Sequence, residues 1–149
     1  MMYEEQLRDP IISLLSEAGF KVYDQLPLFN GKIDFVGIND QNQCIVIEAK
    51  ISKWKDAFKQ ALNYGYGADY VYIAMPNKIA HYVSDNYYDM FNQYRVGIIS
   101  IKDGGAEILI SSFKPEHSQV IKSKIIDNTN LRISNSEKRI KDFKMRFNI

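Results

Sequence analysis

Residues 31–50 read GKIDFVGINDQNQCIVIEAK, and this stretch decides the fold of the chain. Two apolar runs flank the polar segment 39–43, which is rich in residues that form turns. Because side chains alternate across a strand with a period of two, the runs predict a β-hairpin. One face of this hairpin then carries Asp34 from the first strand, and Glu48 and Lys50 from the second.

A hairpin centred on Gln41 places Asp34 directly opposite Glu48. Residues paired in this way have Cβ atoms roughly 4.5–5.5 Å apart. Two carboxylates at that separation repel each other unless a proton or a cation lies between them. Mg²⁺ takes oxygen ligands and keeps several waters for substrate phosphates, so we expect Mg²⁺ here, with Mn²⁺ as its substitute. The backbone carbonyl of Ala49 is a candidate additional ligand.

Lys50 lies two residues after Glu48 and therefore points to the same side of the strand. Its ammonium group could orient or activate an attacking water, or offset the charge that builds on phosphoryl oxygens. The alternative is an exposed hairpin whose solvated face happens to carry these charges. Asp34 and Glu48 lie in runs that are otherwise almost wholly apolar, which favours the metal-site interpretation.

An amphipathic helix is expected over residues 3–18, where apolar side chains recur at helical spacing before Gly19. On a helical wheel Glu4 falls near the apolar stripe, three residues before Leu7, so its carboxylate could look inward. The alternative is that Glu4 and Glu5 are acids of the first turn that favour the helix N-terminus. The spacing leaves both interpretations open.

Four short motifs follow one another through the first two-thirds of the chain. They are an opening E-x-x-L, an acidic strand residue after a glycine, an E-x-K tripeptide and a helical Q-x-x-x-Y. They fall at Glu4–Leu7, Gly31–Asp34, Glu48–Lys50 and Gln60–Tyr64. This series resembles the PD-(D/E)xK nuclease superfamily, with Ile33 in place of the proline before the aspartate, at a position that varies widely in the superfamily.

The resemblance implies a restriction-endonuclease-like mixed β-sheet flanked by helices, similar to that of archaeal Holliday-junction resolvases. It also implies metal-dependent cleavage of phosphodiester bonds in DNA, with branched and single-stranded DNA among the substrates left open. Asp34 and Glu48 would bind the metal, and Glu4 would support the metal or its water. Lys50 would serve the nucleophilic water, with Gln60 assisting nearby. Many superfamily members dimerise so that two sites cut two strands, which leaves a homodimer open.

The remaining sequence predicts further alternating elements. In chain order they are a short strand at 21–23, a loop over 25–30, the hairpin, a helix around Gln60, a strand at 70–75, a helix at 78–94, and strands at 96–101 and 106–111. This order predicts an α/β or α+β fold with a sheet that is covered on both faces.

A length of 149 residues favours one domain with a real core, and 46% hydrophobic and 25% charged residues are typical of a globular protein. The single cysteine, Cys44, excludes an internal disulfide, argues against a Cys-based metal site and fits a reducing cytoplasm. No run of 18 apolar residues predicts a membrane span. Glu4, Glu5 and Arg8 interrupt the segment where a signal peptide would need an apolar run.

The net charge of +1 hides an asymmetry. Residues 1–116, the expected nuclease-like core, hold 11 Lys and Arg against 15 Asp and Glu, whereas residues 117–149 hold 8 against 3. We expect residues 117–149 to be a basic helical extension of the same domain, with a break near residues 128–130. Its last part surrounds an apolar stripe with candidate phosphate-binding residues, namely Lys138, Arg139, Lys141, Lys144 and Arg146. The alternative is a helix docked on the body or on a second subunit, with solvated charges outside.

Two other functions remain compatible with the sequence. One is a non-catalytic nucleic-acid-binding module on the same fold, for which the basic C-terminal segment is the motivation. The other is a protein-interaction subunit, for which the apolar stripe of the last helix is the motivation. DNA cleavage is favoured over both because all four charged positions of the expected site are present.

Overall fold

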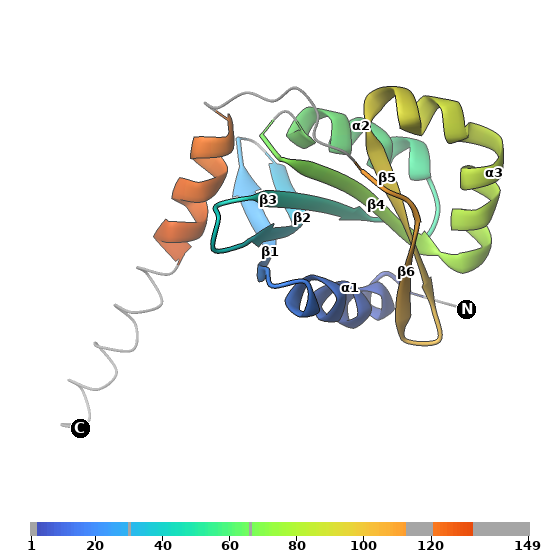
Figure 1. The fold of residues 1–149 in the computed structure, drawn as a ribbon, viewed down its shortest axis with the longest axis horizontal. Coiled ribbons are helices and arrows are strands. Elements are labelled where there is room, and N and C mark those ends of the chain that lie inside the picture. Colours follow the sequence, from blue (N-terminus) through green and yellow to red (C-terminus); the bar gives the residue numbers. More distant parts are fainter. Residues whose placement is uncertain (1–2, 30, 66, 113–120, 133–149) are drawn as a thin grey trace.

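The computed structural model describes residues 3–29, 31–65, 67–112 and 121–132 (Figure 1). One six-stranded sheet forms the centre of the molecule, and its strand order follows the chain, β1-β2-β3-β4-β5-β6. The elements are α1 (Glu5–Glu17), β1 (Lys21–Leu28), β2 (Gly31–Ile38), β3 (Cys44–Ala49), α2 (Trp54–Gly65), β4 (Tyr70–Pro76), α3 (Asn77–Tyr94), β5 (Val96–Lys102) and β6 (Gly105–Ile110). Residues 121–132 form a further helix.

The sheet is mixed, because its strands are joined in two different ways. Strands β1, β2 and β3 form an antiparallel meander through short turns. Strands β3, β4 and β5 are parallel, and α2 and α3 supply the crossovers that parallel neighbours require. Strand β6 returns antiparallel to β5. The expected α+β architecture, a mixed sheet flanked by helices, is confirmed.

Helices cover both faces of the sheet (Figure 1). On one face α1 packs its buried side chains Leu7, Ile11 and Leu15 against alternate residues of β3, β4 and β5. On the other face α2, α3 and the helix at 121–132 cover a larger core, to which Ile125 contributes. All six residues of β3 are buried, as the near-continuous apolar run of this strand predicts.

The register of the hairpin agrees with the prediction made from its turn. Phe35 pairs with Ile47 and Ile38 pairs with Cys44, so the turn is centred on Gln41. The next position along the two strands brings Asp34 opposite Glu48. Asn39 fixes the turn, since its side-chain oxygen accepts backbone N–H bonds from Gln41 at 3.1 Å and from residue 43 at 2.8 Å.

The expected loop over residues 25–30 is wrong, because β1 continues to Leu28. Leu26 and Leu28 are both buried, and β1 pairs with β2 as far as the Leu28–Gly31 pair. The buried leucines at alternate positions hold this segment in the sheet, although Pro27 lies between them. Gln25 adapts to this by taking a positive φ of 50° in the middle of the strand.

The expected helix break near residues 128–130 is also wrong. Helical geometry runs without interruption from residue 121 to residue 132. Thr129 is buried, and its hydroxyl donates a hydrogen bond to the carbonyl of Ile126 at 2.7 Å. Asn128 is satisfied across the interface, where its amide donates to the carbonyl of Pro27 at 2.7 Å. Both polar side chains therefore find partners that are compatible with a continuous helix.

The candidate phosphate-binding residues Lys138, Arg139, Lys141, Lys144 and Arg146 lie outside the described residues. Among the helices that are described, none is long and apolar enough to cross a membrane.

Candidate metal centre

The strands β2 and β3 separate at the point where Asp34 and Glu48 face each other. Their ladder ends at the Phe35–Ile47 pair, whereas β2 stays paired with β1 as far as Gly31. The N–H of Ala49, which would otherwise continue the ladder, donates instead to Asp34 Oδ2 at 2.9 Å. A side chain has therefore replaced a backbone acceptor, and a gap begins between the two strands.

Glu48 lies in this gap with 1% of its surface exposed. Within the described part of the chain, its Oε1 atom is buried and has no hydrogen-bond partner. An unpaired buried carboxyl oxygen is costly, and such atoms are rare in folded proteins. Glu48 is therefore the least satisfied buried group of the sheet.

The pKa of Glu48 is raised from an ordinary value of 4.5 to about 9. Burial is the largest cause, followed by the charge of Asp34 and by a hydrogen bond between the two carboxyl groups. The backbone N–H of Asp34 and the ammonium group of Lys50 act in the opposite direction. Without a cation, the Asp34–Glu48 pair therefore retains a proton at neutral pH.

The donor atoms of this gap fit a hard divalent cation. Asp34 and Glu48 supply carboxylate oxygens, and Mg²⁺ prefers oxygen ligands. Ala49 could add a carbonyl, because the N–H and C=O of one residue point to the same side of a strand and its N–H points toward Asp34. The Glu48 oxygen without a hydrogen-bond partner fits the same kind of ion, since a cation would satisfy it.

The structure does not bring Glu4 to this pair. Glu4 is exposed at the start of α1, the helix that covers the opposite face of the sheet. In the described ranges there is no group of three or more His, Cys, Asp or Glu side chains placed to hold a metal ion. The two strand carboxylates therefore form the acidic part of the site without a third acid from α1.

Lys50 is close enough to Glu48 for its charge to lower the pKa of that carboxyl. Its backbone N–H donates to the carbonyl of Ala74 at 3.0 Å, which keeps this end of β3 attached to β4 after the separation from β2. The ammonium group thus belongs to the strand that stays paired with β4. It is only partly exposed.

Tyr64 also approaches the carboxyl pair, from the last turn of α2. Burial raises the pKa of its hydroxyl, and the charges of Glu48 and then Asp34 raise it further. The hydroxyl lies against Gly31, where an added Cβ atom would collide with it. Gln60 lies one turn earlier on α2 and is exposed. Tyr64 is therefore the member of the Q-x-x-x-Y motif whose contact with the site is visible.

Sequence reasoning missed Gln25. Its side-chain amide donates to Asp34 Oδ1 at 3.4 Å from the neighbouring strand. The segment around Gln25 was expected to be a loop, so nothing placed this residue in register with Asp34. The alternating leucines at 26 and 28 were the signal that could have identified the strand.

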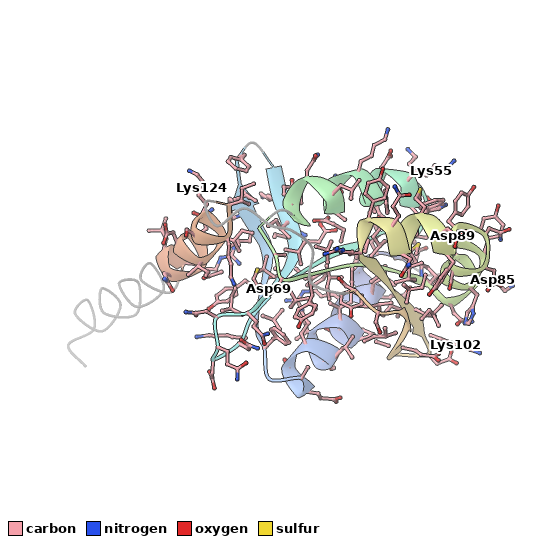
Figure 2. All side chains as sticks on the ribbon, turned by 45° about the horizontal axis from the view of Figure 1, so that its top comes forward. Lys55, Asp69, Asp85, Asp89, Lys102 and Lys124 are labelled. Atoms are coloured by element: carbon pink, nitrogen blue, oxygen red, sulfur yellow. The ribbon has the colours of Figure 1, made fainter. Side chains whose placement is uncertain are left out.

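Described basic residues of the C-terminal segment attach their helix to the body. Lys122 forms an ion pair with the buried Asp69 at 2.9 Å, and Lys124 lies 5.9 Å from the ring of Phe29. Figure 2 shows Asp69 below this helix and Lys124 on it. Arg132 donates to the carbonyl of Asp24 at 2.8 Å. For residues 121–132, docking on the body accounts for these charges.

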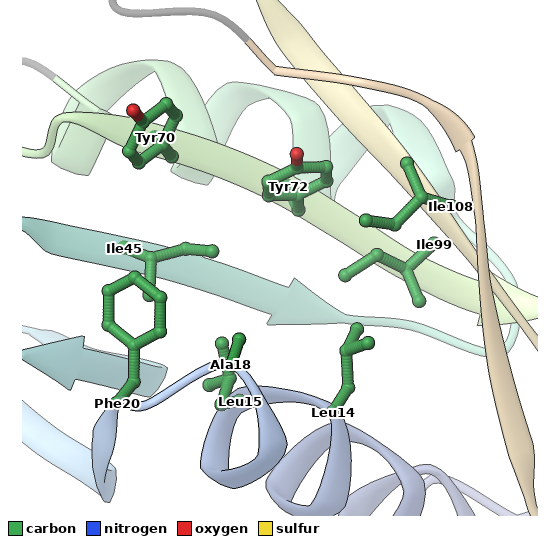
Figure 3. A pocket seen from close by; sticks show the side chains of 9 residues that line it. All are labelled: Leu14, Leu15, Ala18, Phe20, Ile45, Tyr70, Tyr72, Ile99 and Ile108. Atoms are coloured by element: carbon green, nitrogen blue, oxygen red, sulfur yellow. The ribbon is translucent and has the colours of Figure 1, made fainter. Parts of the chain in front are cut away.

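Two further cavities lie away from the carboxyl pair. The first, about 230 Å³, is an apolar cavity between the end of α1 and the sheet, beside Phe20, Tyr70 and Tyr72 (Figure 3). The second, about 520 Å³, lies where β4 and β5 end and includes Ile51, Lys78 and Lys102 in its wall. Only the second borders the segment that follows Lys50.

No family model and no curated protein matches this chain. A protein of unknown function from Silicibacter pomeroyi is similar in structure, with a TM-score of 0.70 at 14% sequence identity, over 97% of this chain and 94% of that protein. A crystal structure of a repair endonuclease from Pyrococcus abyssi has a TM-score of 0.46 at 17% identity, over 68% of this chain and 48% of that protein. The chain thus spans about half the length of the endonuclease. The chain shares the fold of the Silicibacter pomeroyi protein.

Proposed function

We propose that this protein is a metal-dependent nuclease that hydrolyses phosphodiester bonds in DNA. The observation that carries the proposal is the buried Glu48 carboxyl group, which has an oxygen without a hydrogen-bond partner beside a second carboxylate. A structural role would not need such a group, because a neutral amide or an apolar residue would remove its cost. A cation-binding role requires it.

Asp34 and Glu48 would hold Mg²⁺, with the carbonyl of Ala49 as an additional oxygen donor. When bound, the cation would polarise a phosphoryl oxygen and lower the pKa of a coordinated water. Cation binding also requires Glu48 to give up its proton, so the protonated pair is the resting form of the metal-free site. Mn²⁺ fits the same donors.

Lys50 supplies the positive charge that the chain itself brings to the reaction. Its position beside Glu48 suits it to orient the attacking water and to offset charge on the phosphoryl oxygens. Tyr64 faces the same carboxyl pair and could donate a hydrogen bond to a phosphate or to a water. Gln60, one turn away on α2, is an exposed candidate for contact with the substrate.

The nucleic-acid assignment draws on the cavity that Ile51, the residue after Lys50, borders. This 520 Å³ cavity lies away from the carboxyl pair, and Lys78 and Lys102 are in its wall. Lysines there would favour a polyanionic substrate that extends beyond the carboxyl pair. The order of the motifs, which resembles the PD-(D/E)xK superfamily, points to DNA as that polyanion.

A cleavage assay with matched variants tests this proposal. Purified protein is incubated with plasmid, single-stranded and branched DNA in the presence of Mg²⁺ or Mn²⁺, and products are resolved on gels. Asp34→Asn and Glu48→Gln should lose activity by at least on the order of a hundredfold, since each removes a metal ligand. Asp40→Asn is the control, because Asp40 is an exposed acid in the turn of the same hairpin.

Cleavage at the wild-type rate in Glu48→Gln would contradict the assignment of roles. Salt-sensitive DNA binding without cleavage under any metal would instead favour the non-catalytic module.

A further inference from the structure

Gln25 occupies the position next to Asp34 in the row that crosses the sheet at the metal site. The pairs Asp24–Phe35 and Leu26–Ile33 place Gln25 opposite Asp34, just as the β2–β3 register places Glu48 on the other side. Its φ of 50° lies in the left-handed region, which a residue with a side chain adopts at a cost. Backbone conformations of this kind are concentrated at functional sites, where the surrounding structure holds them in place.

Gln25 gives the second oxygen of the Asp34 carboxylate a hydrogen-bond donor. Its Nε2 atom donates to Oδ1 at 3.4 Å, while the N–H of Ala49 donates to Oδ2 at 2.9 Å. Asp34 is therefore held from β1 through one oxygen and from β3 through the other. Because a carboxylate with two fixed donors has little rotational freedom, its remaining lone pairs have a defined direction.

Two arginines, from helices on opposite faces of the sheet, donate hydrogen bonds to the same segment of β1. Arg132, at the end of the helix 121–132, donates to the carbonyls of Asp24 and Gln25 at 2.8 and 3.1 Å. Arg8 of α1 donates to the carboxylate of Asp24 at 3.1 Å. The helix follows this edge strand further, since Asn128 binds the carbonyl of Pro27 at 2.7 Å. The positive-φ residue is thus held by side chains from outside the sheet as well as by its neighbours in β1.

We propose that Gln25 and Arg132 are positioning residues for the metal ligand Asp34. Arg132 binds the carbonyls of the two peptide groups that flank Gln25, and Gln25 transmits that constraint to the Asp34 carboxylate. The inference rests on the proposed function for its purpose, because a fixed carboxylate serves a metal site. The restraint of Asp34 itself depends only on contacts that are present in the metal-free protein.

Hydrogen exchange at the Ala49 amide measures this restraint without any metal. The Ala49 N–H binds Asp34 Oδ2, so greater mobility of Asp34 exposes that amide to solvent. In NMR exchange experiments, Gln25→Ala and Arg132→Met should each raise the rate at Ala49 about tenfold, with Asp34→Ala as the upper limit. The double variant should exchange no faster than the faster single variant, because Arg132 acts through Gln25.

Asn128→Ala is the matched control, since it removes a bond from the same helix to the same strand but leaves Gln25 untouched. Arg132→Lys, which can keep one of the two carbonyl bonds, should give an intermediate rate. An unchanged Ala49 rate in Gln25→Ala overturns the proposal, and so does a double variant whose effects add. Gln25→Ala leaves the helix contacts intact, so it remains informative if Arg132→Met loses the helix.

A second measurement, Mn²⁺ affinity by calorimetry, connects the restraint to the site. Gln25→Ala and Arg132→Met should weaken Mn²⁺ binding about tenfold, in the range found for residues that orient metal ligands, and Asn128→Ala should not. Wild-type affinity in Gln25→Ala would overturn the positioning role. If the wild-type protein binds no Mn²⁺, the proposed function fails, while the exchange rates still decide whether Gln25 and Arg132 restrain Asp34.

Discussion

Two buried acids near opposite ends of β3 have opposite environments. Asp69, 3% exposed, accepts a hydrogen bond from the N–H of Cys44 at 2.8 Å and forms a 2.9 Å ion pair with Lys122. Glu48, 1% exposed, faces another carboxylate and keeps an oxygen without a hydrogen bond. Burial alone therefore does not determine whether the carboxyl group of an acid is satisfied. The partners of that carboxyl group do.

The environments of Asp69 and Glu48 differ because the two side chains connect different parts of the protein. Asp69 links the first residue of β3 to the helix 121–132, and both of these partners are permanent parts of the chain. Glu48 lies where β2 and β3 separate, and it faces the Asp34 carboxyl group with one oxygen that has no hydrogen-bond partner among the described residues. The first arrangement stabilises the fold. The second is stable only with a proton or a cation in it.

The largest difference is expected when the acid at each site is replaced by its amide. Asp69→Asn should lower the free energy of unfolding by about 3–5 kcal/mol, because Lys122 loses the partner of a buried ion pair. Glu48→Gln should leave the metal-free stability at neutral pH unchanged or higher. Urea denaturation of both variants measures the difference, and comparable losses at the two sites would break the distinction.

The double variant Asp69→Asn/Lys122→Met sharpens this result. It removes both charges, so it should recover part of the stability that Asp69→Asn loses. Its Mn²⁺ affinity should equal that of the wild type, since Asp69 lies at the far end of β3 from Glu48.

The second prediction concerns the pH dependence of stability in the metal-free protein. The unfolded chain ionises Glu48 near pH 4.5, whereas the folded protein holds its proton to about pH 9. Within that window the folded state binds more protons, so rising pH favours unfolding by about 1.4 kcal/mol per pH unit. Below pH 4.5 the penalty is absent, and above pH 9 it is complete.

The measurement is the difference in unfolding free energy between wild type and Glu48→Gln from pH 5 to pH 8, without metal. Taking the difference cancels the contributions of other carboxylates. The wild type should lose stability relative to the variant as the pH rises. A flat difference would mean that Glu48 is already ionised and that its environment resembles that of Asp69.

The hairpin and the Asp34–Glu48 pair can be predicted from the sequence because both depend on local patterns. The hairpin register depends on local alternation and on the turn around Asn39, so it brings Asp34 and Glu48 together in the sequence as in the structure. The contribution of Gln25 depends on the second half of β1, which was expected to be a loop. The docking of Lys122 on Asp69 joins segments 53 positions apart, and no local pattern encodes such a contact.

The candidate role of Glu4 illustrates a different limit. Helical spacing shows which residues share a side of a helix, but it does not show which face of the sheet that helix covers. Helix α1 packs on the face opposite α2 and α3, and Glu4 is exposed at its first turn. The positions of Asp34 and Glu48 relative to each other follow from one hairpin. The position of Glu4 relative to them depends on the packing of the whole fold.

The third and smallest effect tests whether Tyr64 belongs to the Glu48 region. Gly31→Ala should displace the Tyr64 hydroxyl, which occupies the space of the new methyl group, and cost about 1 kcal/mol of stability. Mn²⁺ affinity should fall a few-fold in the same variant. Gly105→Ala is the control, because a Cβ atom there meets only the Lys102 carbonyl at an ordinary 3.5 Å. Equal losses in both variants would exclude a specific role for the Gly31–Tyr64 contact.

The most direct test of the central claim is the number of protons released when Mn²⁺ binds. Calorimetric titrations at pH 7 in buffers of different ionisation enthalpy give this number. If a divalent cation replaces the proton that the Asp34–Glu48 pair retains, the wild type should release about one proton per cation and Glu48→Gln none. Mn²⁺ binding without proton release, or with equal affinity in Glu48→Gln, would contradict the account.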